Sequence, residues 1–299
     1  MLSSFKNYLS LIKFSHTIFA MPFALIGFFL GYFSLKNSGM PIESGNFIGS
    51  IYFKLILVIL CMVFARSAAM AFNRWLDEKY DALNPRTAIR EIPAGVIKKR
   101  HALVFVILSC IAFITCTWFI NTICFYLSFV ALFVILFYSY TKRFTPLCHL
   151  VLGVGLSLAP IGAYLAVTGV FNLLPLLFSF TVLFWVSGFD IIYALQDEEF
   201  DRQNHLNSIP AAAGKKSALF ISEFLHLLSA ACVIYAGIYN HFHLIYWIGA
   251  SVFLLLLIYQ HTLVKPKDLS KVNLAFATTN GIASVIFCIF VLLDLFINL

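Results

Sequence analysis

Long apolar segments, separated by short polar stretches, occupy most of this 299-residue chain. A helix of about 20 mostly apolar residues is long enough to cross the hydrocarbon core of a bilayer. We therefore expect an all-α fold, an integral membrane bundle of nine transmembrane helices around a central cavity, in a single domain over residues 1–299. The nine segments are 16–35, 49–72, 102–120, 122–140, 147–168, 173–196, 217–237, 242–263 and 274–297.

The low content of charged residues argues against an ordinary soluble fold. Hydrophobic residues make up 62% of the chain and charged residues only 11%, whereas soluble domains carry about 25% charged residues. A soluble domain of this size buries only about three quarters of the surface of its unfolded chain. Too much apolar surface would remain in water, so a lipid bilayer is the expected surrounding.

The basic residues gather on one side of this predicted topology. Of the 20 Lys and Arg residues, all except Lys36, Lys54 and Arg66 precede the first segment or lie in loops that follow even-numbered segments. Loops rich in Lys and Arg stay in the cytoplasm during insertion. The N-terminus and these loops are therefore predicted to be cytoplasmic, in a multi-pass protein of the inner membrane. The net charge of +7 is explained by this topology and does not predict nucleic acid binding.

Acidic residues are concentrated in two short windows near two of the basic loops, which span about 73–101 and 197–216. Each window holds two aspartates four positions apart. The pairs are Asp77 with Asp81 and Asp197 with Asp201. On a helix, side chains at this spacing lie on one face, about 5–6 Å from each other. Each pair is therefore predicted to form a carboxylate site at the cytoplasmic membrane surface.

The two windows also resemble each other beyond the paired aspartates. Ile-Pro-Ala-Gly at 92–95 follows the first pair, and Ile-Pro-Ala at 209–211, with Gly214 shortly after, follows the second. This echo predicts an internal duplication that places the two clusters opposite each other across the central cavity.

Paired carboxylates at a membrane surface suit a metal-bound diphosphate. Mg²⁺ prefers oxygen ligands and usually bridges one or two carboxylates to substrate phosphates. Basic residues lie nearby in the sequence, and arginine is well suited to bidentate contacts with phosphate oxygens. They are Arg74, Arg86, Arg90, Lys142 and Arg143. Mg²⁺ and a lipid diphosphate with its tail in the bilayer are the ligands that this pattern predicts. Simple solvation of the loop ends is the alternative, favoured for Glu78, Glu198 and Glu199.

One arginine lies within the second apolar segment. Arg66 precedes Asn73 by seven positions, which places both on one helix face and Arg66 about 10 Å deeper. A charge inside the membrane is costly unless it faces a cavity or a partner. Arg66 is therefore a candidate ligand for a substrate carboxylate, and an ion pair with Asp190 is the alternative.

Two tyrosines stand four positions before charged residues of the predicted site. Tyr138 precedes Lys142, and Tyr193 precedes Asp197. Both are candidates to hydrogen-bond the diphosphate or to shape the cavity. The sequence assigns no role to three further polar residues, which are His16, Glu223 and Asp294.

Three stretches combine polar residues at characteristic spacings. They are Asn73 to Asp81 followed by Arg86-Thr87 and Arg90, then Tyr138 with Lys142, and finally Asp190 to Asp201. Together they resemble the signature motifs of the UbiA superfamily of membrane prenyltransferases, and the resemblance extends to the nine-helix architecture.

The resemblance implies Mg²⁺-dependent transfer of a polyprenyl chain from a polyprenyl diphosphate to the ring of an aromatic acid of the 4-hydroxybenzoate type, in quinone biosynthesis. It implies Mg²⁺ binding by Asp77, Asp81, Asp197 and Asp201. It implies substrate binding by Arg66, Asn73, Arg86, Arg90, Tyr138, Lys142 and Tyr193. It implies catalytic roles for Arg66, Lys142 and Asp190, with Arg66 on the acceptor carboxylate and Asp190 orienting or deprotonating the acceptor.

The chain departs from the pattern of many 4-hydroxybenzoate enzymes at two places. Arg74 stands where they have aspartate, and Glu91 and Ile92 follow Arg90 where they have Pro-Leu. With His16-Thr17, these departures resemble a branch associated with the futalosine route to menaquinone, which implies a dihydroxynaphthoate as the alternative acceptor.

Two further functions remain open. Farnesyl transfer of the haem O synthase type needs no ring carboxylate on the acceptor, and Arg66 argues against it. A membrane transporter would place polar residues deep in several helices, whereas this chain gathers its charges at one surface. The sequence indicates no obligate protein partner and predicts neither the donor chain length nor the oligomeric state.

Overall fold

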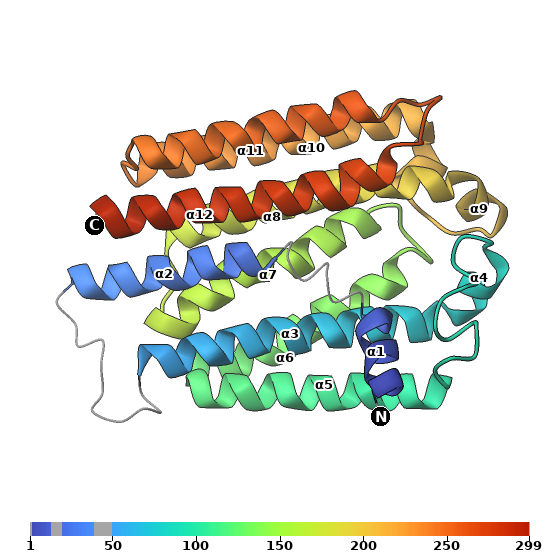
Figure 1. Ribbon diagram of the computed structural model, residues 1–299, viewed down its shortest axis with the longest axis horizontal. Coiled ribbons are helices and arrows are strands. Elements are labelled where there is room, and N and C mark those ends of the chain that lie inside the picture. The colour runs from blue at the N-terminus through green and yellow to red at the C-terminus, as the bar shows by residue number, and fades with distance from the viewer. Residues whose placement is uncertain (1, 13–19, 39–49, 299) are drawn as a thin grey trace.

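The computed structural model describes residues 2–12, 20–38 and 50–298. Long helices run roughly parallel in a bundle, while the short helices α4 and α9 lie together at one end (Figure 1). The helices are α1 (Leu2–Leu11), α2 (Met21–Asn37), α3 (Ile51–Leu76), α4 (Glu78–Leu83), α5 (Lys99–Ile120), α6 (Thr122–Thr141), α7 (Cys148–Thr168), α8 (Leu173–Ala194), η3 (Leu195–Asp197), α9 (Glu198–Gln203), α10 (Ile209–Tyr239), α11 (Leu244–Leu263), η4 (Leu274–Thr279) and α12 (Asn280–Asn298). The prediction of an all-α bundle is confirmed.

Eight helices in the described part of the chain are long and apolar enough to cross a membrane, and the chain is a multi-pass integral membrane protein. They correspond to eight of the nine predicted segments. The remaining segment, 16–35, corresponds to α2, which has 17 residues and packs against α7 and α12 within the bundle. Residues 16–19, and with them His16, lie outside the described residues.

Helix boundaries follow capping residues as well as hydropathy. α3 continues to Leu76, beyond the predicted end at 72, so Asn73 and Arg74 lie on its last turn. The junction between α5 and α6 consists of Asn121, whose side chain accepts a hydrogen bond from Cys124 N at 2.8 Å. Its amide also donates to Leu165 O at 2.8 Å. This asparagine therefore starts α6 and ties the turn to α7.

Glycines allow α2, α7 and α8 to approach closely. A Cβ atom built on Gly27 of α2 would lie 2.0 Å from Pro160 O of α7. One built on Gly153 of α7 would lie 2.5 Å from Leu183 O of α8. Inside a bilayer, helix association depends on such close packing because apolar burial from water contributes little there.

Asp294 has a structural explanation that the sequence does not supply. Its buried carboxylate accepts hydrogen bonds from His243 N and Tyr246 N, each at 3.1 Å. These groups lie at the start of α11, where backbone N–H groups lack partners within the helix. Asp294 of α12 thus caps a neighbouring helix. Glu223, by contrast, is exposed on α10.

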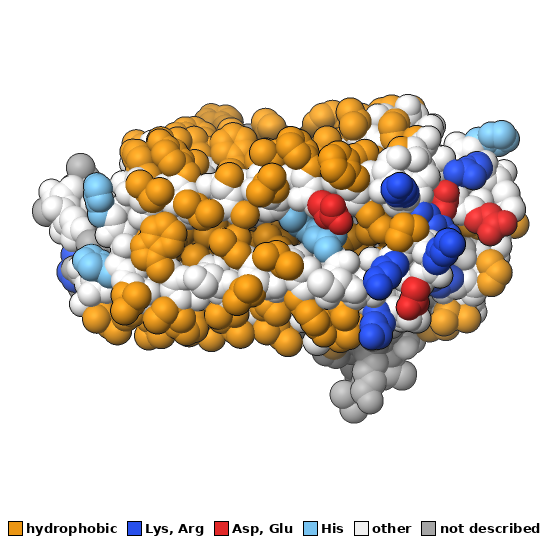
Figure 2. Space-filling model, turned by 90° about the horizontal axis from the view of Figure 1, so that it is seen from above, with side chains coloured by type: hydrophobic (Ala, Val, Ile, Leu, Met, Phe, Trp, Pro, Cys, Tyr) orange, Lys and Arg blue, Asp and Glu red, His pale blue; other side chains and the backbone are white. Residues whose placement is uncertain are grey.

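Charged side chains gather at the end of the bundle that carries α4 and α9, and most of the remaining surface in this view is hydrophobic (Figure 2). The one-sided charge distribution expected from the sequence is therefore present on this face. Which end faces the cytoplasm remains a prediction.

Candidate active site

The two aspartate pairs occupy equivalent places in the fold. Asp77 lies at the junction between α3 and the six-residue helix α4, and Asp197 lies at the start of the six-residue helix α9. Asp81 and Asp201 are each the fourth residue of their short helix, and both are buried, with 6% and 0% exposure. In each pair, the two aspartates therefore lie on either side of a bend in the backbone that follows a membrane helix.

The likeness between the two regions continues beyond the short helices. Gly95 and Gly214 both adopt left-handed backbone conformations, with φ of 74° and 78°, which glycine adopts without steric cost. Each is followed by the start or continuation of a long helix, α5 or α10. The matching backbone conformations support the predicted internal duplication.

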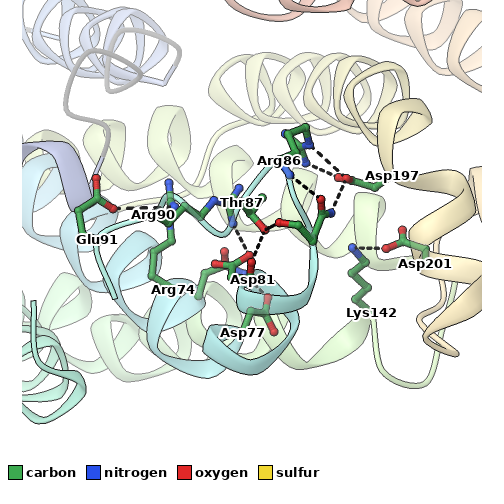
Figure 3. Close-up of polar contacts among 12 residues, drawn as sticks. Arg74, Asp77, Asp81, Arg86, Thr87, Arg90, Glu91, Lys142, Asp197 and Asp201 are labelled. Carbon is green, nitrogen blue, oxygen red and sulfur yellow. Dashed lines mark hydrogen bonds and ion pairs between the residues drawn. The ribbon is translucent and has the colours of Figure 1, made fainter. Parts of the chain in front are cut away.

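The two clusters face each other across a polar cavity of about 270 Å³. Arg86, from the loop after α4, places Nε 3.2 Å from Asp197 Oδ1 and also donates through Nη2 to Oδ2 (Figure 3). Asn84 Nδ2 donates to the same Oδ1 at 3.1 Å. Arg86 Nη1 donates to Tyr193 Oη at 2.8 Å. One arginine therefore connects the first cluster to both a carboxylate and a tyrosine of the second.

Each of the four aspartates contacts a different basic side chain, and Figure 3 shows these contacts for Asp81, Asp197 and Asp201. The pairs are Arg143 with Asp77 at 3.2 Å, Arg90 with Asp81 at 2.7 Å, Arg86 with Asp197, and Lys142 with Asp201 at 2.7 Å. All four basic partners are among the residues expected from the sequence to contact a diphosphate. The cavity wall thus alternates between groups suited to a cation and groups suited to an anion.

Burial and neighbouring charges act against each other in this network. Burial raises the pKa of Asp77, although a hydrogen bond from Arg143 opposes the shift. Burial would lower the pKa of Lys142, but the nearby carboxylates, above all Asp201, outweigh it and raise the pKa. Lys142 is therefore held as a cation at the cavity wall.

Carboxylate oxygens suited to a metal are available here. Asp81 Oδ2 is buried and has no hydrogen-bond partner among the described residues. In the same part of the chain, no group of three or more His, Cys, Asp or Glu side chains is placed to hold a metal ion. A divalent cation would therefore take one or two carboxylates and complete its shell with substrate oxygens and water. This is the usual coordination of Mg²⁺, so the residues present fit this ion.

A second, apolar cavity of about 410 Å³ adjoins the polar one, with walls from α3, α5, α6 and α7. Five residues line both cavities and so mark their junction. They are Arg66, Met70, Tyr138, Leu152 and Leu156. Arg66 Nε is buried there without a hydrogen-bond partner among the described residues. An arginine with unused hydrogen-bonding capacity thus stands where polar and apolar spaces meet.

Asp190 also lines the polar cavity, and its side-chain partner is His149. His149 Nδ1 lies 2.7 Å from Asp190 Oδ2, so the alternative of an Arg66–Asp190 ion pair is not what the structure shows. His149, only 3% exposed, and Asn84 were not singled out from the sequence. A histidine within the predicted apolar segment 147–168 was the sequence signal that could have identified His149 as a candidate.

Two residues that depart from the signature pattern lie close together. Arg74 is 3% exposed, and its Nη1 lies 4.0 Å from Glu91 Oε2. Ser10 Oγ donates to Glu91 Oε1 at 2.5 Å, which ties α1 to this loop. Arg74 lines the polar cavity, with Glu91 as its charged partner.

The remaining candidates lie on the same cavity. Asn73 donates through Nδ2 to Asp77 Oδ2 at 3.2 Å, which orients this carboxylate. The Tyr193 ring packs against Phe276 with ring centroids 4.3 Å apart, and the Arg86 guanidinium lies 5.2 Å from the Tyr193 ring centroid. The structure therefore brings together every candidate residue from the three signature stretches.

Comparisons with known proteins agree with this architecture. The model of the UbiA prenyltransferase family matches residues 20–287. The 4-hydroxybenzoate octaprenyltransferase of Francisella tularensis subsp. mediasiatica is 29% identical over 242 residues, covering 80% of this chain and 84% of that protein. The apo structure of a UbiA homolog from Aeropyrum pernix K1 has a TM-score of 0.76 at 28% identity, covering 95% of this chain and 98% of that one.

A further solved structure shares the fold at lower identity. The UbiA homolog from Archaeoglobus fulgidus bound to GPP and Mg²⁺ has a TM-score of 0.72 at 18% identity, covering 97% of this chain and 100% of that one. The family model covers nearly the whole helical bundle and includes both aspartate pairs. The chain therefore belongs to the UbiA prenyltransferase family and is an enzyme of prenyl transfer.

Proposed function

We propose that the protein transfers a polyprenyl chain from a polyprenyl diphosphate to the ring of an aromatic acid of the 4-hydroxybenzoate type, in quinone biosynthesis. The observation that carries this proposal is the junction at Arg66. There a polar cavity with two facing acid pairs meets an apolar cavity. The polar cavity suits the charged head of one substrate, and the apolar cavity suits its tail. Arg66 suits the carboxylate of a second substrate.

The donor diphosphate occupies the polar cavity in this proposal, and its tail occupies the apolar one. Arg86, Arg90 and Lys142 bind the diphosphate oxygens, helped by Asn73, Tyr138 and Tyr193. The two aspartate pairs, Asp77 with Asp81 and Asp197 with Asp201, would each hold Mg²⁺, which when bound would supply neutralisation of the charge on the departing diphosphate. The Archaeoglobus fulgidus homolog bound to GPP and Mg²⁺ supports a prenyl diphosphate and Mg²⁺ as the ligands.

The acceptor lies at the junction, with its carboxylate on Arg66. A guanidinium whose buried Nε has no hydrogen-bond partner in the described part of the chain is suited to the charge-assisted, bidentate hydrogen bonds that carboxylates accept. This contact holds the ring between the two cavities, within reach of Asp190. The name of the Francisella tularensis relative supports an acid of the 4-hydroxybenzoate type.

The residues of the cavity wall promote the reaction by electrostatics. The bond between the allylic carbon and the diphosphate oxygen breaks, and Arg86, Arg90 and Lys142 stabilise the charge that develops on that oxygen. The apolar walls limit access of water to the allylic cation. An electron-rich ring carbon then bonds to the allylic carbon, and Asp190 orients or deprotonates the acceptor.

A dihydroxynaphthoate is the second candidate acceptor. The observation that favours it is the Arg74–Glu91 contact, because both residues depart from the pattern of 4-hydroxybenzoate enzymes and lie together beside the cavity. A dihydroxynaphthoate also carries a carboxylate that Arg66 can bind. A farnesyl acceptor of the haem type would leave Arg66 without this partner.

The one-sided distribution of Lys and Arg supports a location in the inner membrane with the active site facing the cytoplasm. We treat the whole chain as one catalytic unit, since helices from both halves line the polar cavity.

A transfer assay in membranes tests the proposed function. Membranes containing the protein receive one polyprenyl diphosphate, Mg²⁺ and either 4-hydroxybenzoate or a dihydroxynaphthoate, with the methyl ester of each acid as the matched control. We expect prenylation of at least one free acid and much weaker prenylation of its ester. Equal use of acid and ester, or no transfer to either acid, would contradict the proposal.

A further inference from the structure

His149 is a buried histidine whose two ring nitrogens both have partners. Nε2 lies 3.3 Å from Ile209 N, the first backbone N–H of α10, and accepts its hydrogen bond. A backbone N–H only donates, so Nε2 carries a lone pair. In neutral imidazole the proton then sits on Nδ1, which donates to Asp190 Oδ2 at 2.7 Å. The backbone contact thus determines the tautomer.

The partner on the Nε2 side is itself held in place. Asn207 N donates to Lys142 O at 2.6 Å, and the Cys148 thiol donates to Asn207 O at 3.6 Å. The segment that leads from the second acidic cluster to α10 is therefore fastened to the end of α6 and the start of α7. His149 extends this attachment to Asp190 of α8.

The hydrogen bond from His149 distinguishes the two oxygens of Asp190. Oδ2 accepts the hydrogen bond from Nδ1–H, whereas no described residue donates to Oδ1, and Asp190 lines the polar cavity. Asp190 is 24% exposed and His149 is 4% exposed by side chain. Water therefore has little access to the histidine, and the orientation of the carboxylate depends on this contact.

We infer that His149 is a positioning residue that holds Asp190 so that its Oδ1 receives the ring proton of the acceptor. The inference rests on the proposed function and deepens it. A ring carbon forms a bond to the allylic carbon, and the diphosphate leaves with the electron pair of the broken C–O bond. The proton of the substituted ring carbon passes to Asp190 Oδ1, and the C–H electron pair restores the aromatic ring.

Two substitutions separate the contacts of His149. His149→Asn places an amide N–H near the position of Nδ1 and keeps the donor to Asp190. His149→Gln places an amide oxygen near Nε2, so it keeps an acceptor for Ile209 N and loses the donor to Asp190. We expect His149→Gln to lower kcat by about 10–100-fold, the scale of a misplaced catalytic group, and His149→Asn to retain most of the rate.

An isotope measurement identifies the affected step. With an acceptor deuterated at the ring carbons next to the hydroxyl group, the wild-type protein should turn over at the rate of the undeuterated acceptor, because proton loss follows slower steps. His149→Gln should be slower with the deuterated acceptor, because proton loss has become limiting. Mg²⁺-dependent oxygen exchange within the donor diphosphate should persist in both variants.

The outcomes are distinguishable. A wild-type rate without an isotope effect in His149→Gln would overturn the inference, and so would loss of oxygen exchange together with transfer, which indicates a general structural role. Poor turnover by His149→Asn equal to that of His149→Gln would also overturn it. If the wild-type protein transfers to neither acid, the proposed function fails and this inference fails with it.

Discussion

Arg86 and Asp197, 111 positions apart in the chain, bind each other across the polar cavity, with Nε 3.2 Å from Oδ1. The same guanidinium donates to Tyr193 Oη at 2.8 Å. Arg86 follows the first acidic cluster, and the other two residues belong to the second. This contact is a direct link between the two acidic regions, at the place where the proposed diphosphate would bind.

Replacement of Arg86 tests whether its planar fork is needed. Arg86→Lys keeps the positive charge but cannot reproduce simultaneous contacts to a carboxylate and a tyrosine. We expect a raised KM for the donor and a kcat lowered by about 10–100-fold, since transition-state charge stabilisation by one donor has this magnitude or more. Arg86→Ala should be lower still.

Arg202→Lys is the matched control for Arg86, because Arg202 is 63% exposed and pairs with Glu198 on α9. An exposed pair of this kind contributes little. Steady-state kinetics with varied donor measure both variants. Equal kinetics for Arg86→Lys and Arg202→Lys would contradict the role assigned to Arg86.

Replacement of Arg66 should weaken binding of the acceptor and leave binding of the donor largely unchanged. Arg66 lies at the junction of the two cavities, and its Nε has no partner among the residues that the structure describes, so Arg66→Ala removes a charged ligand from the acceptor carboxylate. We expect the KM for the acceptor to rise by about 10–100-fold, corresponding to the loss of a charge-assisted hydrogen bond, with a much smaller change in the KM for the donor. The opposite pattern would refute the assignment.

Gly27 tests the close packing that supports the site. A Cβ at this position would lie 2.0 Å from Pro160 O, so Gly27→Ala should force α2 and α7 apart and destabilise the protein by about 1–3 kcal/mol. Gly162→Ala is the control on α7, because its Cβ would meet nothing within 4 Å. Thermal unfolding in detergent should show a lower Tm for Gly27→Ala alone. Equal Tm values would argue against the close approach of α2 and α7.

The sequence predicts the bundle well because membrane helices depend mainly on local hydropathy. The acidic pairs are also evident, since few acids occur elsewhere in the chain. The bend at Asp77 was not predicted, because a four-residue spacing fits both a continuous helix and two helices joined at a turn. The additional turn of α3 to Leu76 was missed because Asn73 and Arg74 interrupt the apolar run.

Contacts between distant positions could not be predicted in the same way. His149 and Asp190 are 41 positions apart, and their meeting depends on how α7 packs against α8. The contact between Arg74 and Glu91 likewise depends on the path of the loop after α4. The sequence shows that Arg74 and Glu91 each depart from the signature pattern, but only the folded structure shows that the two residues lie together.

The central claim is that the two aspartate pairs together hold Mg²⁺ and one diphosphate. The most direct measurement is Mg²⁺-dependent prenyl transfer by the purified wild-type protein, Asp77→Ala and Asp197→Ala, before and after removal of divalent cations by a chelator. We predict that the wild-type protein loses activity with the chelator and regains it with Mg²⁺. Both variants should lose at least about 100-fold in kcat at every Mg²⁺ concentration, the scale of one essential electrostatic contact. Near-normal turnover in both variants, or wild-type activity unaffected by the chelator, would contradict the claim.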